Sequence, residues 1–135
     1  MPAIRVPALV RLALTLALTL LLSAFHAFVG WHKTFSSREE LIKHTAWTVH
    51  LPDWLGKLVG VIEMGLVAAM LVALLRPRFS RVGQLACYGF IVLELVSTAT
   101  HQITQDGASL SQNLVSILLT AALAWLFAER ARATI

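Results

Sequence analysis

Two carboxylates, Glu63 and Glu94, lie deep inside long apolar segments of this 135-residue chain, and they are the residues best suited to chemistry. The helical rise places Glu63 ~13 Å from Trp54 and Glu94 ~15 Å from Thr104, near the middle of a hydrocarbon layer about 30 Å thick. A charged side chain at that depth costs at least about 2.5 kcal/mol, so an intramembrane carboxylate is by default a functional residue. The sequence therefore predicts a proton-handling or ligand-binding site around these two residues.

Other polar residues share the helical faces of the two carboxylates. Side chains that alternate by three and four positions form one seam of a helix, and each apolar segment has such a seam. The four seams are Thr15, Thr19, Leu22 and His26; Gly56, Gly60, Glu63, Val67 and Met70; Gly83, Cys87, Phe90, Glu94, Ser97 and His101; and Asn113, Ser116, Thr120, Leu123 and Phe127. Their polar members concentrate in the half of each segment that is distant from the chain termini. This distribution predicts a polar cavity that opens on that side, where two nearby carboxylates would share a proton.

We expect His26, Ser97 and His101 to complete the site with the two carboxylates. The alternative interpretation is that hydroxyl and small residues on the seams serve packing and interhelical hydrogen bonds, and that the imidazoles near the interface are structural. A haem held by His26 and His101 as axial ligands is not expected, because histidine pairs of this kind are commonly structural.

Several classes of chemistry find no support in the sequence. Cys87 is the one cysteine, which excludes a disulfide, a paired thiol motif and a cysteine-rich metal site within the chain. No nucleophile and base pair, phosphate loop or dense metal-ligand motif occurs, so no catalytic residue is predicted. We expect an accessory or ligand-binding membrane subunit rather than a stand-alone enzyme.

Composition and hydropathy identify the elements that must position the site. The chain is 58% hydrophobic and 13% charged, whereas soluble domains are roughly half apolar and a quarter charged. Four apolar runs, at about 6–29, 54–75, 82–104 and 110–128, are each long enough to cross a bilayer. They predict an all-α, membrane-embedded antiparallel four-helix bundle that forms a single domain over residues 1–135. Between the first two runs, Ser37 and Glu40 have the spacing of a capping box, which predicts a short interfacial helix, with a solvated loop as the alternative.

Basic residues predict the orientation of these segments, because lysine and arginine are retained on the cytoplasmic side. One side carries Arg5, Arg11, Arg76, Arg78, Arg81, Arg130 and Arg132, and the other carries Lys33, Arg38, Lys43 and Lys57. Four acidic residues balance the second group in number. Both termini are therefore expected in the cytoplasm, in a multi-pass protein of the inner (plasma) membrane. Nucleic-acid binding is not expected although the net charge is +4, because the arginines fringe the apolar runs.

Four short motifs resemble the DoxX and DoxX-like family of small four-span membrane proteins. They are Gly-Trp-His-Lys at 30–33, Leu-Pro-Asp-Trp-Leu at 51–55, Gly-Val-Ile-Glu at 60–63 and Thr-Ala-Thr-His at 98–101. The resemblance implies a four-helix bundle in a bacterial-type inner membrane and an association with quinone-linked or other redox enzymes. It implies functional roles for Glu63 and His101, whereas Glu94 matches no family position and rests on depth and spacing alone.

Three functions remain open at this point. The first is a quinone-binding subunit that serves a membrane redox complex, which would make a quinone the cofactor. The second is a carrier for a small solute, coupled to protons through the same cavity. The third is a non-catalytic partner or assembly protein, whose polar seams specify packing. The expected partners are the lipid bilayer and either a redox enzyme complex or further copies of the chain.

Overall fold

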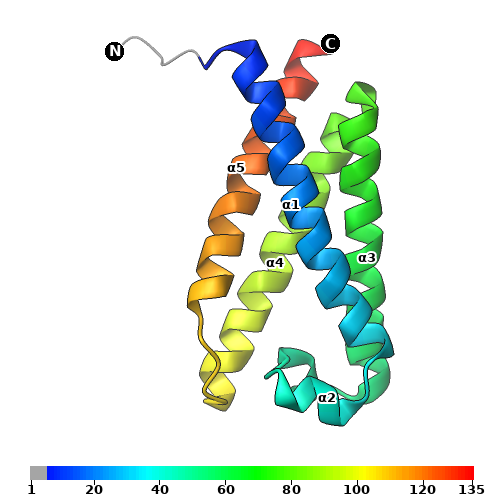
Figure 1. Cartoon of the computed structure of the whole chain (residues 1–135), viewed down its shortest axis with the longest axis vertical. Coiled ribbons are helices and arrows are strands. Elements are labelled where there is room, and N and C mark those ends of the chain that lie inside the picture. The colour runs from blue at the N-terminus through cyan, green and yellow to red at the C-terminus, as the bar shows by residue number, and fades with distance from the viewer. Residues whose placement is uncertain (1–5) are drawn as a thin grey trace.

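Four long helices form an antiparallel bundle (Figure 1). A computed structural model describes residues 6–135. The elements are α1 (Ala8–Phe35), α2 (Arg38–Lys43), the 3₁₀ turn η1 (Trp47–His50), α3 (Asp53–Leu75), the 3₁₀ turn η2 (Pro77–Phe79), α4 (Ser80–Thr104) and α5 (Ser111–Ala133). The start of α1 and the end of α5 lie at one end of the bundle, here called the terminal end (Figure 1). The opposite end, which α2 covers, is called the α2 end.

The four long helices are those that the apolar runs predict, and each is long and apolar enough to cross a membrane. Their outward faces carry large apolar side chains such as Leu20, Leu58, Val92 and Leu118, as lipid contact requires. The predicted all-α bundle of four membrane-spanning helices is therefore confirmed, and the chain is a multi-pass membrane protein.

Two helices run further than the apolar runs indicate. α1 continues six residues past position 29 to Phe35, because no helix breaker follows Gly30 until the extended backbone of Ser36. α5 continues to Ala133, where Glu129 and Arg132 form an ion pair one turn apart. Polar residues interrupt both extensions, with His32, Lys33 and Thr34 in α1 and Glu129, Arg130 and Arg132 in α5. Hydropathy alone therefore predicts helix ends that are too early.

The predicted interfacial helix is confirmed as α2, although it is short. Ser37 caps it, since its hydroxyl accepts a hydrogen bond from the Glu40 amide at 3.2 Å. The helix ends at Lys43, and Thr45 then takes a left-handed conformation with φ 52°. This turn redirects the chain so that Trp47 and Thr48 of η1 are buried against the bundle.

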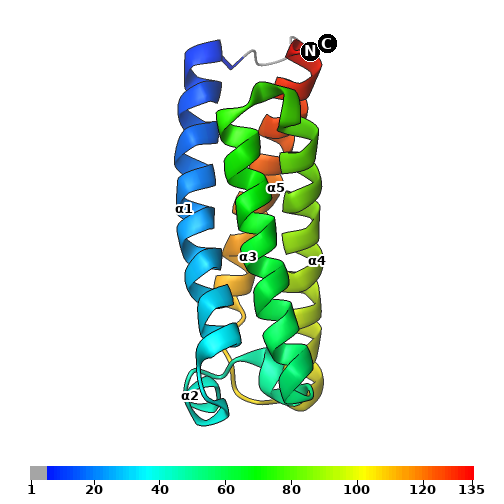
Figure 2. The same ribbon diagram turned by 90° about the vertical axis from the view of Figure 1, so that its right-hand side faces the viewer.

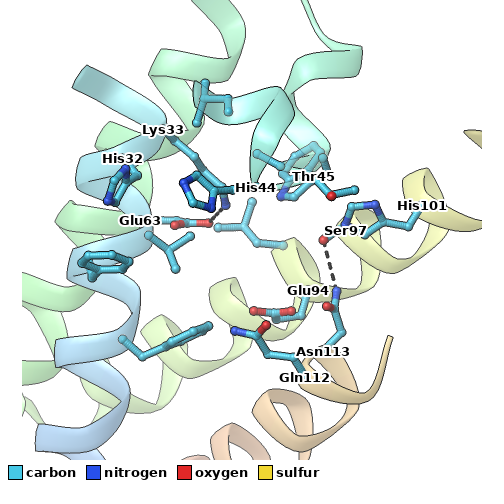
Figure 3. A pocket seen from close by; sticks show the side chains of 17 residues that line it. His32, Lys33, His44, Thr45, Glu63, Glu94, Ser97, His101, Gln112 and Asn113 are labelled. Atoms are coloured by element: carbon cyan, nitrogen blue, oxygen red, sulfur yellow. Dashed lines mark hydrogen bonds and ion pairs between the residues drawn. The ribbon is translucent and has the colours of Figure 1, made fainter. Parts of the chain in front are cut away.

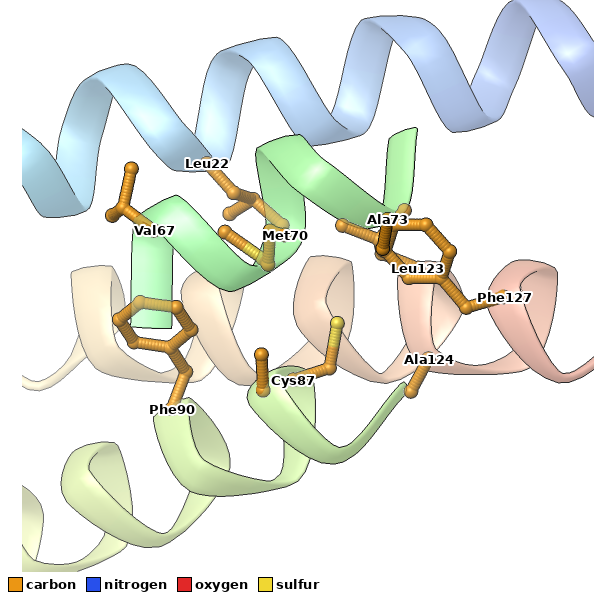
Figure 4. Packing of buried hydrophobic residues seen from close by; sticks show 10 residues of the cluster. Leu22, Val67, Met70, Ala73, Cys87, Phe90, Leu123, Ala124 and Phe127 are labelled. Atoms are coloured by element: carbon orange, nitrogen blue, oxygen red, sulfur yellow. The ribbon is translucent and has the colours of Figure 1, made fainter. Parts of the chain in front are cut away.

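The apolar core fills the bundle between its middle and the terminal end (Figure 4). It consists of Leu22, Val67, Met70, Ala73, Ala86, Cys87, Phe90, Leu123, Ala124 and Phe127. At the terminal end, the Arg130 guanidinium donates to the carbonyls of Ala73 and Leu74, each at 3.0 Å, and satisfies the last turn of α3. This half of the molecule is closed by side-chain packing.

The α2 end is more open because the helices are not evenly spaced. α3 packs between α1 and α4 along the bundle (Figure 2), and α5 packs along α4. α1 and α5 meet near the terminal end, where Arg11 and Glu129 form an ion pair at 3.8 Å. They diverge toward the α2 end (Figure 1).

Candidate functional site

A buried ion pair joins α1 and α3 close to the α2 end. The Lys33 ammonium donates to Glu63 Oε1 at 2.5 Å, and the two side chains are 7% and 4% exposed (Figure 3). The ammonium also lies 5.4 Å from the centroid of the Trp47 ring, so η1 covers the pair with a cation–π contact. Among residues 6–135, Glu63 Oε2 has no hydrogen-bond partner. The pair is thus largely buried, and Glu63 has unused acceptor capacity.

A cavity of about 250 Å³ lies beside this pair. It is lined by α1, α3, α4, α5 and the segment from α2 to η1 (residues 38–50), here called the α2 segment. Its polar lining consists of His32, Lys33, His44, Thr45, Glu63, Glu94, Ser97, His101, Gln112 and Asn113 (Figure 3). Aromatic and aliphatic side chains, among them Phe25, Phe28 and Leu93, supply the rest of the lining. A small space that mixes apolar walls with a few convergent polar groups is typical of a ligand site.

The wall formed by α4 and α5 is a hydrogen-bonded layer. Ser116 Oγ donates to Glu94 Oε1 at 3.3 Å, and Asn113 Nδ2 donates to the hydroxyls of Ser97 and Thr98, each at 3.1 Å. Among residues 6–135, no hydrogen bond joins Glu94 to Glu63. The structure engages Glu63 with Lys33 and Glu94 with Ser116, so the shared proton suggested by the sequence stays a prediction.

Asp106, in the loop between α4 and α5, forms a further polar cluster at the α2 end. Asp106 Oδ2 is 2.6 Å from His101 Nδ1 and 3.1 Å from His50 Nε2, and Oδ1 accepts from the Ala108 amide at 3.1 Å. The hydrogen bond with His101 is the main cause that lowers the pKa of Asp106 to about 2. Asp106 therefore connects η1 to the end of α4 and orients the imidazole of His101.

Replacing Asp106 with asparagine should lower the Tm of the detergent-solubilised protein at pH 7. A carboxylate whose pKa is lowered on folding stabilises the folded state above its ordinary pKa of about 3.9, and this stabilisation is lost as the pH falls toward about 2. The Tm difference between wild type and Asp106→Asn should accordingly shrink between about pH 4 and pH 2. Thermal unfolding across this range tests it, with exposed Glu39→Gln as the control. A Tm difference that does not change with pH would contradict the role of the carboxylate.

Four of the five predicted site residues line one cavity: Glu63, Glu94, Ser97 and His101. His26 does not line it. Its ring is 1% exposed and stacks on Phe90, with centroids 3.9 Å apart and an interplanar angle of 21°. The structure thus places His26 in the packed region next to the apolar core rather than in the polar cavity.

Lys33 is the main candidate absent from the predicted site, since the sequence assigns it only to the charges that set topology and to the family motif at 30–33. Its position carried a signal: it lies seven residues after His26 and continues the seam of Thr15, Thr19 and Leu22. No sequence pattern predicts that residues of the α2 segment line the cavity, since this depends on how the segment folds back against the bundle. Among residues 6–135, no group of three or more histidine, cysteine or acidic side chains is placed to hold a metal ion.

The fold and this site define a small membrane-spanning four-helix protein with a cavity at one end that is lined by ionisable side chains. The chain belongs to the DoxX-like family, whose sequence model matches residues 17–125, and the predicted resemblance is confirmed. The matched range contains every residue that lines the cavity. Comparisons with curated proteins and with solved structures find no match.

Proposed function

We propose that the protein binds a quinone, or a similar small carbonyl and hydroxyl compound, in the cavity at the α2 end and holds it for a membrane redox complex. The observation that carries the proposal is that Lys33, Glu63, Glu94 and Asn113 line one cavity in a membrane-spanning bundle. Its volume of about 250 Å³ is below the roughly 300–1,000 Å³ of sites for drug-sized ligands, which favours a single head group.

The side chains around the cavity complement both redox forms of a quinone. Lys33 uses one of its three N–H donors on Glu63, and another can donate to a quinone carbonyl. Glu94, when ionised, can accept the O–H of a hydroquinone through the carboxylate oxygen that Ser116 does not engage. Conversion of quinone to hydroquinone takes two electrons and two protons. In this proposal the partner enzyme supplies both electrons, Glu94 passes one proton to the quinone, and the second proton comes from solvent through the open side of the cavity.

A solute carrier is less well supported. The apolar core closes the bundle between the cavity and the terminal end, with Phe90, Leu123 and Phe127 fully buried. A carrier would have to open that packing to alternate its access, and neighbouring copies of the chain would have to assist it.

Orientation and location form part of the same proposal. Arg11, Arg76, Arg78, Arg81, Arg130 and Arg132 all belong to segments at the terminal end, and Arg5 lies outside the described residues. We propose that this end faces the cytoplasm, since lysine and arginine are retained there. The cavity then opens on the opposite side of the inner membrane, within a single domain over residues 1–135.

Glu94→Gln should weaken binding of 2,3-dimethoxy-5-methyl-1,4-benzoquinol by roughly tenfold or more, because a charge-assisted hydrogen bond contributes about 1.5–3 kcal/mol. Binding of the corresponding quinone, which has no O–H to donate, should change less. Isothermal titration of the purified protein in micelles measures both constants. Glu129→Gln at the terminal end is the matched control, because Glu129 pairs with arginines far from the cavity.

Failure of both probes to bind the wild-type protein would contradict the proposal. An assembly role predicts a different pattern, in which Glu94→Gln alters stability or partner recovery while the wild type binds neither probe.

A further inference from the structure

A second hollow, an apolar groove of about 390 Å³, lies between α1 and α5 next to the polar cavity. Its lining is mostly apolar, with Leu21, Leu22, Phe25, Val115 and Leu119 as the main contributors. All of its lining residues belong to α1 and α5. These two helices diverge toward the α2 end (Figure 1).

The groove adjoins the cavity. Phe25 and Gln112 line both of them. Ser116 lines the groove and donates its hydroxyl hydrogen bond to Glu94, which lines the cavity. The polar space and the apolar space therefore lie side by side, as the head and the tail of one amphiphilic molecule would require.

The open side of the groove lies at the depth of the acyl chains. Leu21 is 57% exposed and Val115 is 55% exposed, and both belong to membrane-spanning helices. Leu21 is thirteen residues along α1 from Ala8, or about 20 Å, well inside the span. A molecule in the bilayer can reach the groove laterally without passing through water.

We propose that the ligand is an amphiphile that reaches the site sideways from the bilayer between α1 and α5, with its head in the polar cavity and its apolar tail in the groove. The inference rests on the proposed function for the nature of the head, and the groove adds the requirement for a tail. Acyl chains are as apolar as the groove, so moving the tail from lipid into the groove yields no hydrophobic free energy, and the groove only fixes where the tail lies. A side chain that fills the groove should therefore weaken binding by excluding the tail sterically.

Leu21→Trp should fill the groove and weaken binding of the decyl derivative of the benzoquinone by about an order of magnitude. Binding of the tail-less benzoquinone should stay within about twofold, because the head site is intact. Leu20→Trp is the matched control: Leu20 is 51% exposed on the same helix and does not line the groove, so both probes should bind as in wild type.

Val115→Trp and its neighbour Leu114→Trp repeat the comparison on α5, where only Val115 lines the groove. Equal binding of the decyl probe by groove and control variants would overturn the tail site while leaving the proposed function in place. Equal weakening of both probes by the groove variants would also overturn it, since the substitution would then act on the head site. Absence of binding of both probes to wild type would overturn the proposed function itself.

Discussion

Replacing Lys33 with methionine should destabilise the protein by about 3–5 kcal/mol, because it leaves Glu63 buried without its partner. The carboxylate is 4% exposed, and its other oxygen has no hydrogen-bond partner among residues 6–135. So little of the carboxylate is exposed that water in the cavity can replace only a small part of the lost interaction. Unfolding in mixed micelles with a rising fraction of sodium dodecyl sulfate measures the free energy of unfolding.

A double-mutant cycle separates the ion pair from general packing loss. Lys33→Met combined with Glu63→Gln removes both charges, so the double variant should recover roughly 1 kcal/mol or more relative to the sum of the two single variants. Lys43→Met is the control, because the exposed pair of Lys43 with Glu40 should contribute less than about 1 kcal/mol. Strict additivity of Lys33→Met and Glu63→Gln would show that the two side chains do not stabilise each other.

The four-helix architecture could be predicted from the sequence because few backbone structures can cross a bilayer. A run of apolar residues must form a helix to satisfy its backbone, and the period of the helix then assigns the faces. The seam residues Thr19, Gly60, Met70 and Phe90 are indeed buried, since each lies on the face that the spacing selected. The depth of Glu63 and Glu94 follows from the same rise per residue.

The residues that form the site were harder to predict from the sequence, because they are brought together by tertiary contacts. Lys33 was separated from the first span by the drop in hydropathy at Trp31, and only the continuation of α1 to Phe35 turns its side chain toward Glu63. Trp47 reaches the pair only after the chain reverses at Thr45. Side-chain periodicity specifies faces along one helix and says nothing of where a connecting segment folds back.

The groove between α1 and α5 could not be predicted for a related reason. Its existence depends on the angle at which two helices cross, and that angle arises from how side chains of all four helices interlock. Leu21 and Val115 are ordinary lipid-facing residues by sequence. Their role in the groove follows from the divergence of the helices at the α2 end.

The close approach of α1 and α3 is the remaining condition for the ion pair, and Gly60 makes it possible. A Cβ atom added at Gly60 would lie 2.6 Å from the Gly30 carbonyl oxygen and 2.9 Å from Lys33 Cβ, and it would also collide with the Thr34 hydroxyl. Reciprocally, a Cβ at Gly30 would lie 2.9 Å from the Gly60 carbonyl oxygen. The two backbones touch within one turn of Lys33 and Glu63, as small residues allow in membrane helices.

Gly60→Ala should therefore force α1 away from α3, destabilise the protein by about 1–3 kcal/mol and weaken binding of the benzoquinone probe. Gly65→Ala on the same helix is the matched control, because no atom lies within 4 Å of its added Cβ. That substitution should be neutral or stabilising by up to about 1 kcal/mol, since alanine is the better helix former. Unfolding in mixed micelles and probe titration on both variants measure these effects. Equal stability and equal binding of the two variants would mean that the spacing of α1 and α3 does not set the geometry of Lys33 and Glu63.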